Sequence, residues 1–471
     1  MPGLFAALAR RVVYPLQERA LKRPTFEYLG NLERSQWLPR AALEELQCDK
    51  LQNLLRIALE HCPWHAQRLR ECGLADTLER GGLQLSDLQG LPTMTKRDAR
   101  ENGTAMRWQG VPGGGFPYST GGSSGEPLIF HFGRWRQASD AAGRMRARGW
   151  WGVGVGDREV YLWGAPIELS KTDRVRTLRD RLLNQLVLNA FDMSARTMDE
   201  YIGAIGAYRP QCIYGYASSI ALLAAHAVGR RASLRSPELR VVCTTGEPLY
   251  PHQRQLIADV FGVPVANEFG SRDIGFTAHE TPASEMLLMS ESIIFEVLDE
   301  EGRPVASGEM GEAVMTGLCS DAQPFIRYRT GDMVRLDTQP PSCGRGLHRI
   351  SEIGGRSTDF IVRSDGSIMH ALAVIYVVRD TEGVAQFKVI QNTTSDLEVV
   401  YVADSRWSDA TEARIAAGMR KRLGENCRIA LRKVDAIAAE ASGKHRYVVS
   451  HVPLPSGLNA ARSDRIGAGA R

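Results

Sequence analysis

The stretch that decides the fold runs from Arg240 to Gly270 and reads RVVCTTGEPLYPHQRQLIADVFGVPVANEFG. An apolar, β-branched run ends in a glycine, a helical stretch follows, and a second apolar run again ends in a glycine. The runs VYLWG (160–164) and QCIYGY (211–216), with the helical stretch 218–230 after them, repeat the pattern. Strands that alternate with helices predict an α/β fold with a largely parallel sheet, whose functional residues lie at the carboxyl ends of the strands.

The pattern changes on both sides of this core. Residues 292–318 hold two apolar runs separated by Glu-Gly and Ser-Gly turns, which indicate an antiparallel β-hairpin region. The expected organisation is an N-terminal domain of residues 1–355 (helical 1–110, α/β core 111–290, β-rich 291–355), a small α+β C-terminal domain of residues 356–455, and a disordered tail of residues 456–471. Within the C-terminal domain we expect helices at 371–379 and 408–423 and strands at 386–391, 397–402 and 427–434.

Composition narrows the class of protein. The 471 residues are 43% hydrophobic and 24% charged, as in globular chains, and the net charge of +4 makes no case for a nucleic-acid partner. The eight cysteines include no CxxC pair, so a reducing cytoplasm is the expected compartment. Cys62, His65 and Cys72 could be metal ligands or part of a buried helix face, because residues 40–73 are predicted to be helical with a break near Pro63.

The N-terminal residues suggest an amphipathic helix. Arg10 and Arg11 interrupt the apolar run, which argues against a signal peptide, and no stretch reaches the ~20 apolar residues of a membrane span. Two alternatives stay open: a helix docked on the body of the protein, or loose attachment to a membrane surface. The predicted apolar face consists of Leu4, Phe5, Leu8, Val12 and Leu16.

A glycine- and hydroxyl-rich segment lies between two apolar stretches and could bind an anion. Glycines permit a tight turn whose backbone N–H groups converge on a phosphate, although a polar linker would have a similar composition. Glu126 follows the segment, where a cation would have favoured phosphate further. The candidate phosphate loop consists of Ser119, Thr120, Gly121, Gly122, Ser123, Ser124 and Gly125.

Two further motifs follow predicted strands. A glycine at a strand end allows a flat ring to approach the backbone, and an aromatic side chain beside a glycine can stack on a base. Asp273 could hold magnesium through ATP, whereas an ion pair with Arg272 is the plainer alternative. The motifs consist of Thr245, Gly246, Glu247 and Pro248, and of Glu268, Phe269, Gly270, Ser271 and Asp273.

Three charged residues occur in later glycine-containing turns. Asp332, in the run Arg327-Tyr328-Arg329-Thr330-Gly331-Asp332, could accept both hydroxyls of a ribose. Arg356 stands where the C-terminal domain begins and could bridge ribose and phosphate. Lys444, in Ser442-Gly443-Lys444, could stabilise charge on a carboxylate and an α-phosphate. Each of these turns alone is also compatible with a solvated surface loop.

Taken in this order and spacing, the motifs resemble those of the adenylate-forming superfamily of acyl-CoA synthetases and adenylation domains. Within it the sequence is most similar to the phenylacetate-CoA ligase family and its capsule-biosynthesis relatives, over about residues 40–450. YRTGD (328–332), the following Gly355-Arg356 and the terminal Gly443-Lys444 carry most of this resemblance, with Leu91–Lys96 and Gly152–Arg158 in support.

The resemblance implies an AMP-forming acid–thiol ligase that uses ATP, Mg²⁺ and CoA. It implies that Lys444 acts in adenylation, that Arg356 and Asp332 bind ribose, that Asp273 holds magnesium, and that the C-terminal domain is a mobile lid with its hinge at Thr358. It also implies that the wall of the acyl pocket is formed by Tyr214, Gly215, Tyr216 and Ala217.

The acceptor and the assembly stay open at this stage. CoA, a carrier-protein thiol, an amine or a hydroxyl could each receive the acyl group, because Val362–His370 differs from the pantetheine-contacting stretch of phenylacetate ligases. The amine or hydroxyl alternative would make an amide or ester ligase of capsule or natural-product biosynthesis. A non-catalytic ATP-binding relative is a further alternative, and a homodimer is one possible assembly.

Overall fold

The computed structural model describes residues 4–119, 128–164, 178–190, 193–246, 249–299, 301–353, 360–437 and 448–452. The chain divides into two compact units, each of which is described by itself. The first unit comprises Met1–Thr120, Leu128–Asp157 and Ala266–Arg356, and the second comprises Gly121–Pro127, Arg158–Val265 and Ser357–Arg471.

This division differs from the predicted one, because residues 158–265 group with the C-terminal residues. The buried apolar side chains of these two segments form one hydrophobic cluster, in which Ile220 and Phe261 occur together with Met369 and Phe387. Movement of residues 356–455 as a separate lid domain therefore stays a prediction.

The N-terminal part of the first unit is helical, and a proline sets one boundary. The predicted break near Pro63 is confirmed, since α4 ends at His61 and α5 begins at Pro63. His65 lies on the buried face of α5, and its Nε2 is 2.9 Å from the carbonyl oxygen of Pro324. The elements are α1 (Leu4–Leu8), a π-helical turn (Ala9–Val13), α2 (Tyr14–Ala20), α3 (Thr25–Ser35), α4 (Arg40–His61), α5 (Pro63–Glu71), α6 (Leu74–Arg80), a 3₁₀ turn (Leu85–Gly90) and α7 (Lys96–Glu101).

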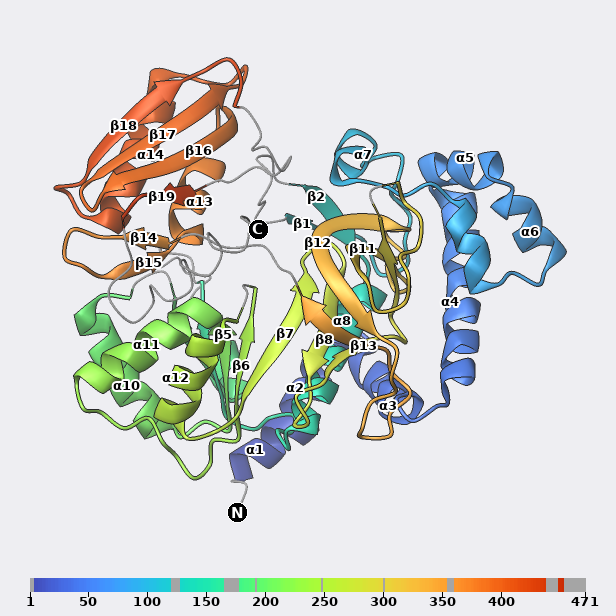
Figure 1. The fold of residues 1–471 in the computed structure, drawn as a ribbon, viewed down its shortest axis with the longest axis horizontal. Helices are drawn as coiled ribbons and strands as arrows, with labels where there is room; N and C mark the ends of the chain where they lie inside the picture. Colours follow the sequence, from blue (N-terminus) through green and yellow to red (C-terminus); the bar gives the residue numbers. More distant parts are fainter. Residues whose placement is uncertain are drawn as a thin grey trace, which may run out of the picture. The chain divides into compact units, whose positions relative to one another are not determined.

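Antiparallel strands form the rest of the first unit (Figure 1). The hairpin of β1 (Phe116–Ser119) and β2 (Ile129–Phe132) precedes α8 (Arg134–Trp150). The strands that follow have the order β10-β11-β12-β13-β9-β8-β7, and every neighbouring pair among them is antiparallel. These strands are β7 (Val265–Ser271), β8 (Gly275–Glu280), β9 (Met286–Leu288), β10 (Ile293–Leu298), β11 (Met310–Gly317), β12 (Tyr328–Asp337) and β13 (Arg349–Ile353).

The parallel strands β3, β4, β5 and β6 of the second unit span less of the chain than the predicted α/β core. The predicted α/β core of residues 111–290 is not parallel throughout, because β8 pairs antiparallel with β7 after a turn too short for the crossover that a parallel pair needs. The parallel strands have the order β6-β5-β3-β4, and α10, α11 and α12 cover one face of them (Figure 1). These elements are β3 (Glu159–Trp163), β4 (Gln185–Asn189), α10 (Ala195–Tyr208), β5 (Cys212–Tyr216), α11 (Ala217–Gly229), β6 (Val241–Thr245) and α12 (Pro251–Phe261).

The C-terminal residues of the second unit form a small α+β layer, and its five predicted elements are confirmed. The sheet has the order β18-β17-β16-β19, with α13 and α14 packed against it. The elements are β14 (Phe360–Val362), β15 (Ile368–His370), α13 (Leu372–Arg379), β16 (Val384–Thr393), β17 (Asp396–Ala403), α14 (Asp409–Leu423), β18 (Arg428–Lys433) and β19 (Val448–Ser450).

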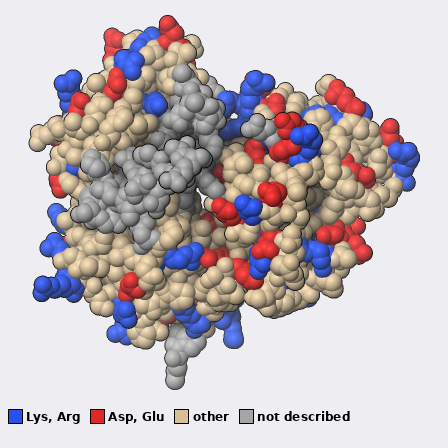
Figure 2. Space-filling model, in the orientation of Figure 1, with Lys and Arg blue, Asp and Glu red and all other residues tan. Residues whose placement is uncertain are grey.

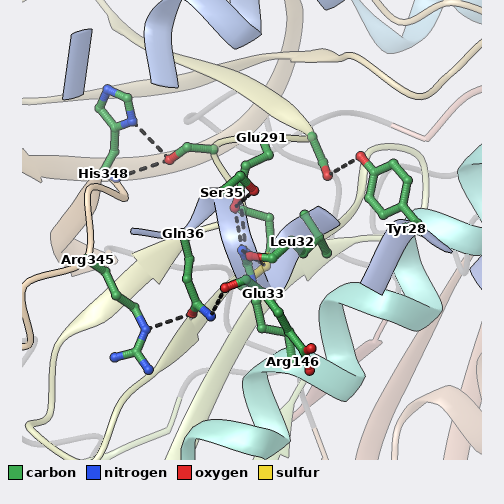
Figure 3. Close-up of polar contacts among 12 residues, drawn as sticks. Tyr28, Leu32, Glu33, Ser35, Gln36, Arg146, Glu291, Arg345 and His348 are labelled. Atoms are coloured by element: carbon green, nitrogen blue, oxygen red, sulfur yellow. Dashed lines mark hydrogen bonds and ion pairs between the residues drawn. The ribbon is translucent and has the colours of Figure 1, made fainter. Parts of the chain in front are cut away.

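A buried polar network fixes the N-terminal helices to the rest of the first unit (Figure 3). Arg146 on α8 forms an ion pair with Glu291, and both side chains are 1% exposed. Ser35 donates to Glu291 Oε1 at 2.9 Å, and Arg146 donates to the carbonyl oxygen of Leu32 at 3.1 Å. Each of these groups has a partner, as buried charges require, so the network ties α3, α8 and the segment before β10 together.

Acidic and basic side chains are interspersed over the face of the molecule drawn in Figure 2. Within the described ranges, no helix combines the length and the apolar character that crossing a membrane would require.

Candidate functional site

The candidate phosphate loop connects the two strands of a hairpin. Ser119, at the end of β1, pairs with Ile129 at the start of β2, so the ends of the loop are held side by side. Thr120–Pro127 themselves lie outside the described residues. The guanidinium of Arg272 donates to the carbonyl oxygen of Ser119 at 3.0 Å. This bond brings the β7–β8 turn to the base of the loop, although the two segments are far apart in the sequence.

Side chains of α8 contact the turn from Ser271 to Gly275. Asp140 accepts a hydrogen bond from the backbone N–H of Phe276 at 3.1 Å, and Arg136 forms an ion pair with Asp140 at 3.2 Å. Gly275 has a φ of +110°, and a Cβ there would lie 1.8 Å from Nη2 of Arg136. Only glycine fits this position, which explains the Asp-Ile-Gly sequence after the strand.

Asp273 is held by a tyrosine from the neighbouring motif. The hydroxyl of Tyr328, at the start of β12, donates to Oδ2 of Asp273 at 2.6 Å, and both residues are buried. The edge of the Tyr328 ring packs against Phe325. A carboxylate has about four acceptor positions, so one tyrosine hydroxyl leaves Oδ1 able to accept further contacts. The donor type is therefore one that Mg²⁺ prefers, and the side chain fits a monodentate magnesium ligand.

The turn that carries Asp332 is shaped by its neighbour β11. Gly331 has a φ of +76°, and its N–H donates to Glu312 at 2.9 Å. Thr330 donates to the carbonyl oxygen of Ala313 at 2.9 Å and accepts from the N–H of Asp332 at 3.2 Å. The register between β11 and β12 shifts at this point, as a β-bulge does when it redirects a side chain. The half-buried Asp332 is thus held in a structured turn.

Arg327, just before β12, forms a buried ion pair and also bonds the backbone at the start of the segment Leu91–Lys96. Arg327 pairs with Glu296 at 2.9 Å and donates to the carbonyl oxygens of Gln89 and Leu91. Burial raises the pKa of Glu296, against the lowering effect of Arg327. Met94 bridges to Tyr328 through backbone bonds on either side of it. The start of the YRTGD strand is therefore held by a buried ion pair and by backbone bonds. No motif in the sequence marks the residues that form them.

In the second unit, the predicted residues lie at the carboxyl ends of parallel strands. Tyr216 and Thr245 are direct neighbours in the pairing of β5 with β6. Gly246 has a φ of +77°, and a Cβ there would lie 3.2 Å from the ring of Tyr216. Trp163, at the end of β3, stacks on Tyr216 with ring centroids 4.4 Å apart. The candidate acyl-pocket wall Tyr214–Ala217 is thus part of an aromatic layer.

Several functional candidates lie outside the described residues: Thr120–Gly125, Glu247, Pro248, Arg356, Thr358 and Lys444. Glu268 and Phe269 lie on β7, where Glu268 is buried and Phe269 is partly buried. In the described ranges, no group of three or more His, Cys, Asp and Glu side chains is arranged to hold a metal ion. Sequence reasoning assigned no individual role to Arg136, Trp163, Glu296, Glu312 or Tyr328. Two of them had a local signal: Trp163 precedes a glycine at a strand end, and Tyr328 begins the YRTGD motif.

Comparison with known proteins agrees with this architecture. The family model described as the CapK C-terminal domain matches residues 361–451. Protein CapK of Staphylococcus aureus is 22% identical over 419 residues, which are 87% of this chain and 90% of that protein. Phenylacetate-coenzyme A ligase of Thermus thermophilus is 24% identical over 353 residues, which are 69% of this chain and 73% of the ligase. A solved structure of 2-hydroxyisobutyryl-CoA ligase, in complex with 2-HIB-AMP and CoA, has a TM-score of 0.58 at 21% identity and covers 89% of this chain and 91% of that chain.

The fold is therefore that of the adenylate-forming CoA ligases. The homologues of the chain are proteins named Protein CapK and phenylacetate-CoA ligase, which confirms the resemblance that its motifs indicated.

Proposed function

We propose that this protein is an AMP-forming ligase that activates a carboxylic acid with ATP and transfers the acyl group to a thiol, either of CoA or of a carrier protein. The observation that carries the proposal is the pair of bonds made by the β7–β8 turn, from Arg272 to Ser119 and from Asp273 to Tyr328. These bonds connect Ser119, at the base of the glycine- and serine-rich loop, the β7–β8 turn with its carboxylate, and the YRTGD strand. An ATP-dependent adenylation needs all three.

In the first half-reaction, a carboxylate oxygen of the acid attacks the α-phosphorus of ATP, and the bond to pyrophosphate breaks. The backbone of Ser119–Gly125 holds the departing phosphates, and Asp332 with Arg356 holds the ribose. Lys444 stabilises the charge that develops between the acid and the α-phosphate. A magnesium ion held by Asp273 would neutralise phosphate charge. By the resemblance, Phe269 and Thr245–Pro248 are the residues that would contact the base.

In the second half-reaction, a thiol loses its proton to solvent, its sulfur attacks the acyl carbonyl carbon, and AMP leaves with the electrons of the broken C–O bond. The acid lies against Tyr214–Ala217, and rotation of residues 356–455 about Thr358 brings in the acceptor. We place this reaction in a reducing cytoplasm, the compartment expected for a chain whose eight scattered cysteines include no CxxC pair.

A second candidate, transfer to an amine or a hydroxyl, is favoured by one observation. The C-terminal residues, which would present the acceptor, match the CapK C-terminal domain model. The nucleophile could therefore differ from that of a phenylacetate-CoA ligase while the first half-reaction stays the same.

Acid-dependent exchange of labelled pyrophosphate into ATP tests the first half-reaction, with a panel of aryl, short-chain and amino acids. We expect at least one acid to support exchange and Lys444→Ala to abolish it while nucleotide binding is nearly retained. Hydroxylamine trapping with and without CoA then separates a thiol acceptor from the alternatives. If none of the acids in the panel supports exchange, ligase activity is refuted and a non-catalytic ATP-binding protein is favoured.

A further inference from the structure

The N-terminal helical segment, Leu4–Ala20, exposes four of its large apolar side chains. This segment comprises α1, the π-helical turn and α2. Four of the five residues of the predicted apolar face are exposed, which leaves the surface-attachment alternative open. The exposed fractions are 46% for Phe5, 47% for Leu8, 42% for Val12 and 57% for Leu16, and we call these four residues the apolar stripe.

The opposite side of the segment is the side that docks. Ala6 and Ala9 are buried, and a Cβ on Gly156 would lie 2.9 Å from the carbonyl oxygen of Ala6. Arg10 donates to the carbonyl oxygen of Val155 at 2.8 Å. Alanine against glycine allows such a close backbone approach, whereas leucine or phenylalanine would not fit. The docked orientation therefore directs the apolar stripe away from the unit.

The exposed charges beside the stripe are all positive. Between Leu4 and Arg23 the only acidic residue is Glu18, which is buried and paired with Arg23. Arg11, Arg19 and Lys22 are exposed. In Figure 2, basic side chains lie at the edge of the molecule where Figure 1 places α1.

We propose that the segment Leu4–Lys22 docks on an anionic lipid surface. The apolar stripe enters the boundary between headgroups and acyl chains, and Arg11, Arg19 and Lys22 face the lipid phosphates. A second copy of the chain fits this surface less well, because a symmetric contact would bring each cation close to its own counterparts. The proposal is independent of the ligase activity.

Sedimentation of the full chain with vesicles tests the proposal, using phosphatidylcholine alone and phosphatidylcholine mixed with phosphatidylglycerol. We expect binding to the mixed vesicles, weakened by added salt. Leu8→Glu with Leu16→Glu is expected to lower the affinity by at least about tenfold, because two leucines leave the lipid. Replacing Arg11, Arg19 and Lys22 by glutamine is expected to lower it by about fivefold per residue.

The matched control is Leu178→Glu with Leu182→Glu, since these helical leucines are 60% and 43% exposed in the second unit. This variant should bind like the wild type. Circular dichroism of both double variants shows whether the fold is retained. Equal binding to the two kinds of vesicle, no binding to either, or a wild-type dimer that Leu8→Glu with Leu16→Glu dissociates would overturn the proposal.

Discussion

Replacing Tyr328 by phenylalanine removes one hydroxyl and leaves the ring contact with Phe325 in place. The lost bond to Asp273 is 2.6 Å long, and the two residues are only 3% and 8% exposed. A hydrogen bond to a charged group contributes about 1.5–3 kcal/mol. If this bond orients Asp273 as the transition state requires, the adenylation rate falls by about 10- to 150-fold, at one factor of ten per 1.36 kcal/mol.

The rate of pyrophosphate exchange at saturating ATP measures this effect, with a magnesium titration alongside. Tyr201→Phe is the matched control, because the hydroxyl of Tyr201 bonds the backbone of Asn189, which belongs to no predicted motif, at 2.9 and 3.1 Å. We expect that control to lose about 1 kcal/mol of stability and to keep its exchange rate. An exchange rate for Tyr328→Phe equal to that of the control would show that the bond does not orient Asp273 for catalysis.

Three further predictions concern the same unit. Gly331→Ala forces a non-glycine residue to a φ of +76°, so we expect about 1–2 kcal/mol of strain and weaker ATP binding, measured by calorimetry. The control is Gly302→Ala: Gly302 has a φ of +81° but lies outside the motif, so this variant should lose stability and keep its ATP affinity. Arg146→Met leaves Glu291 buried without its ion-pair partner and should lower the free energy of unfolding by about 3–5 kcal/mol. The additional change Glu291→Leu should restore much of this loss. If the stability losses of the two single variants simply add in the double variant, the prediction is contradicted. Burial raises the pKa of Asp321 to about 6, so the folded state binds the proton more tightly than the unfolded one, and stability should fall as the pH rises from about 4 to 6; urea melts of Asp321→Asn should show a flatter profile in that window.

Several strands and helices of this fold were predictable because local patterns of residues specify them. Strands β3, β5, β6 and β7 and helices α11 and α12 lie where apolar runs and helical periodicity placed them. Glycine follows β3 and β6 directly, at Gly164 and Gly246, for a physical reason that the sequence also suggested, since the chain must turn at the edge of the sheet. Short strands such as β14 and β19, with three residues each, carry too little pattern to be recognised.

The support of the candidate site was not predictable in the same way. Arg272 reaches Ser119 across 153 positions of sequence, and Tyr328 reaches Asp273 across 55. No local pattern pairs residues at such separations. The roles assigned to the motif residues, Arg356 and Lys444 among them, stay predictions.

By itself, the sequence determined the alternation of strands and helices, the order of the motifs and the amphipathic character of the N-terminal segment, because each depends on neighbouring residues. Only the tertiary structure decided which face of that segment docks, since the periodicity of a helix is the same whichever side is buried. Ala6 and Ala9 fit against Gly156, and the larger apolar side chains are left exposed. The partners of Asp273 and Arg272 were decided in the same way, by distant segments that meet only when the sheet and hairpin have formed.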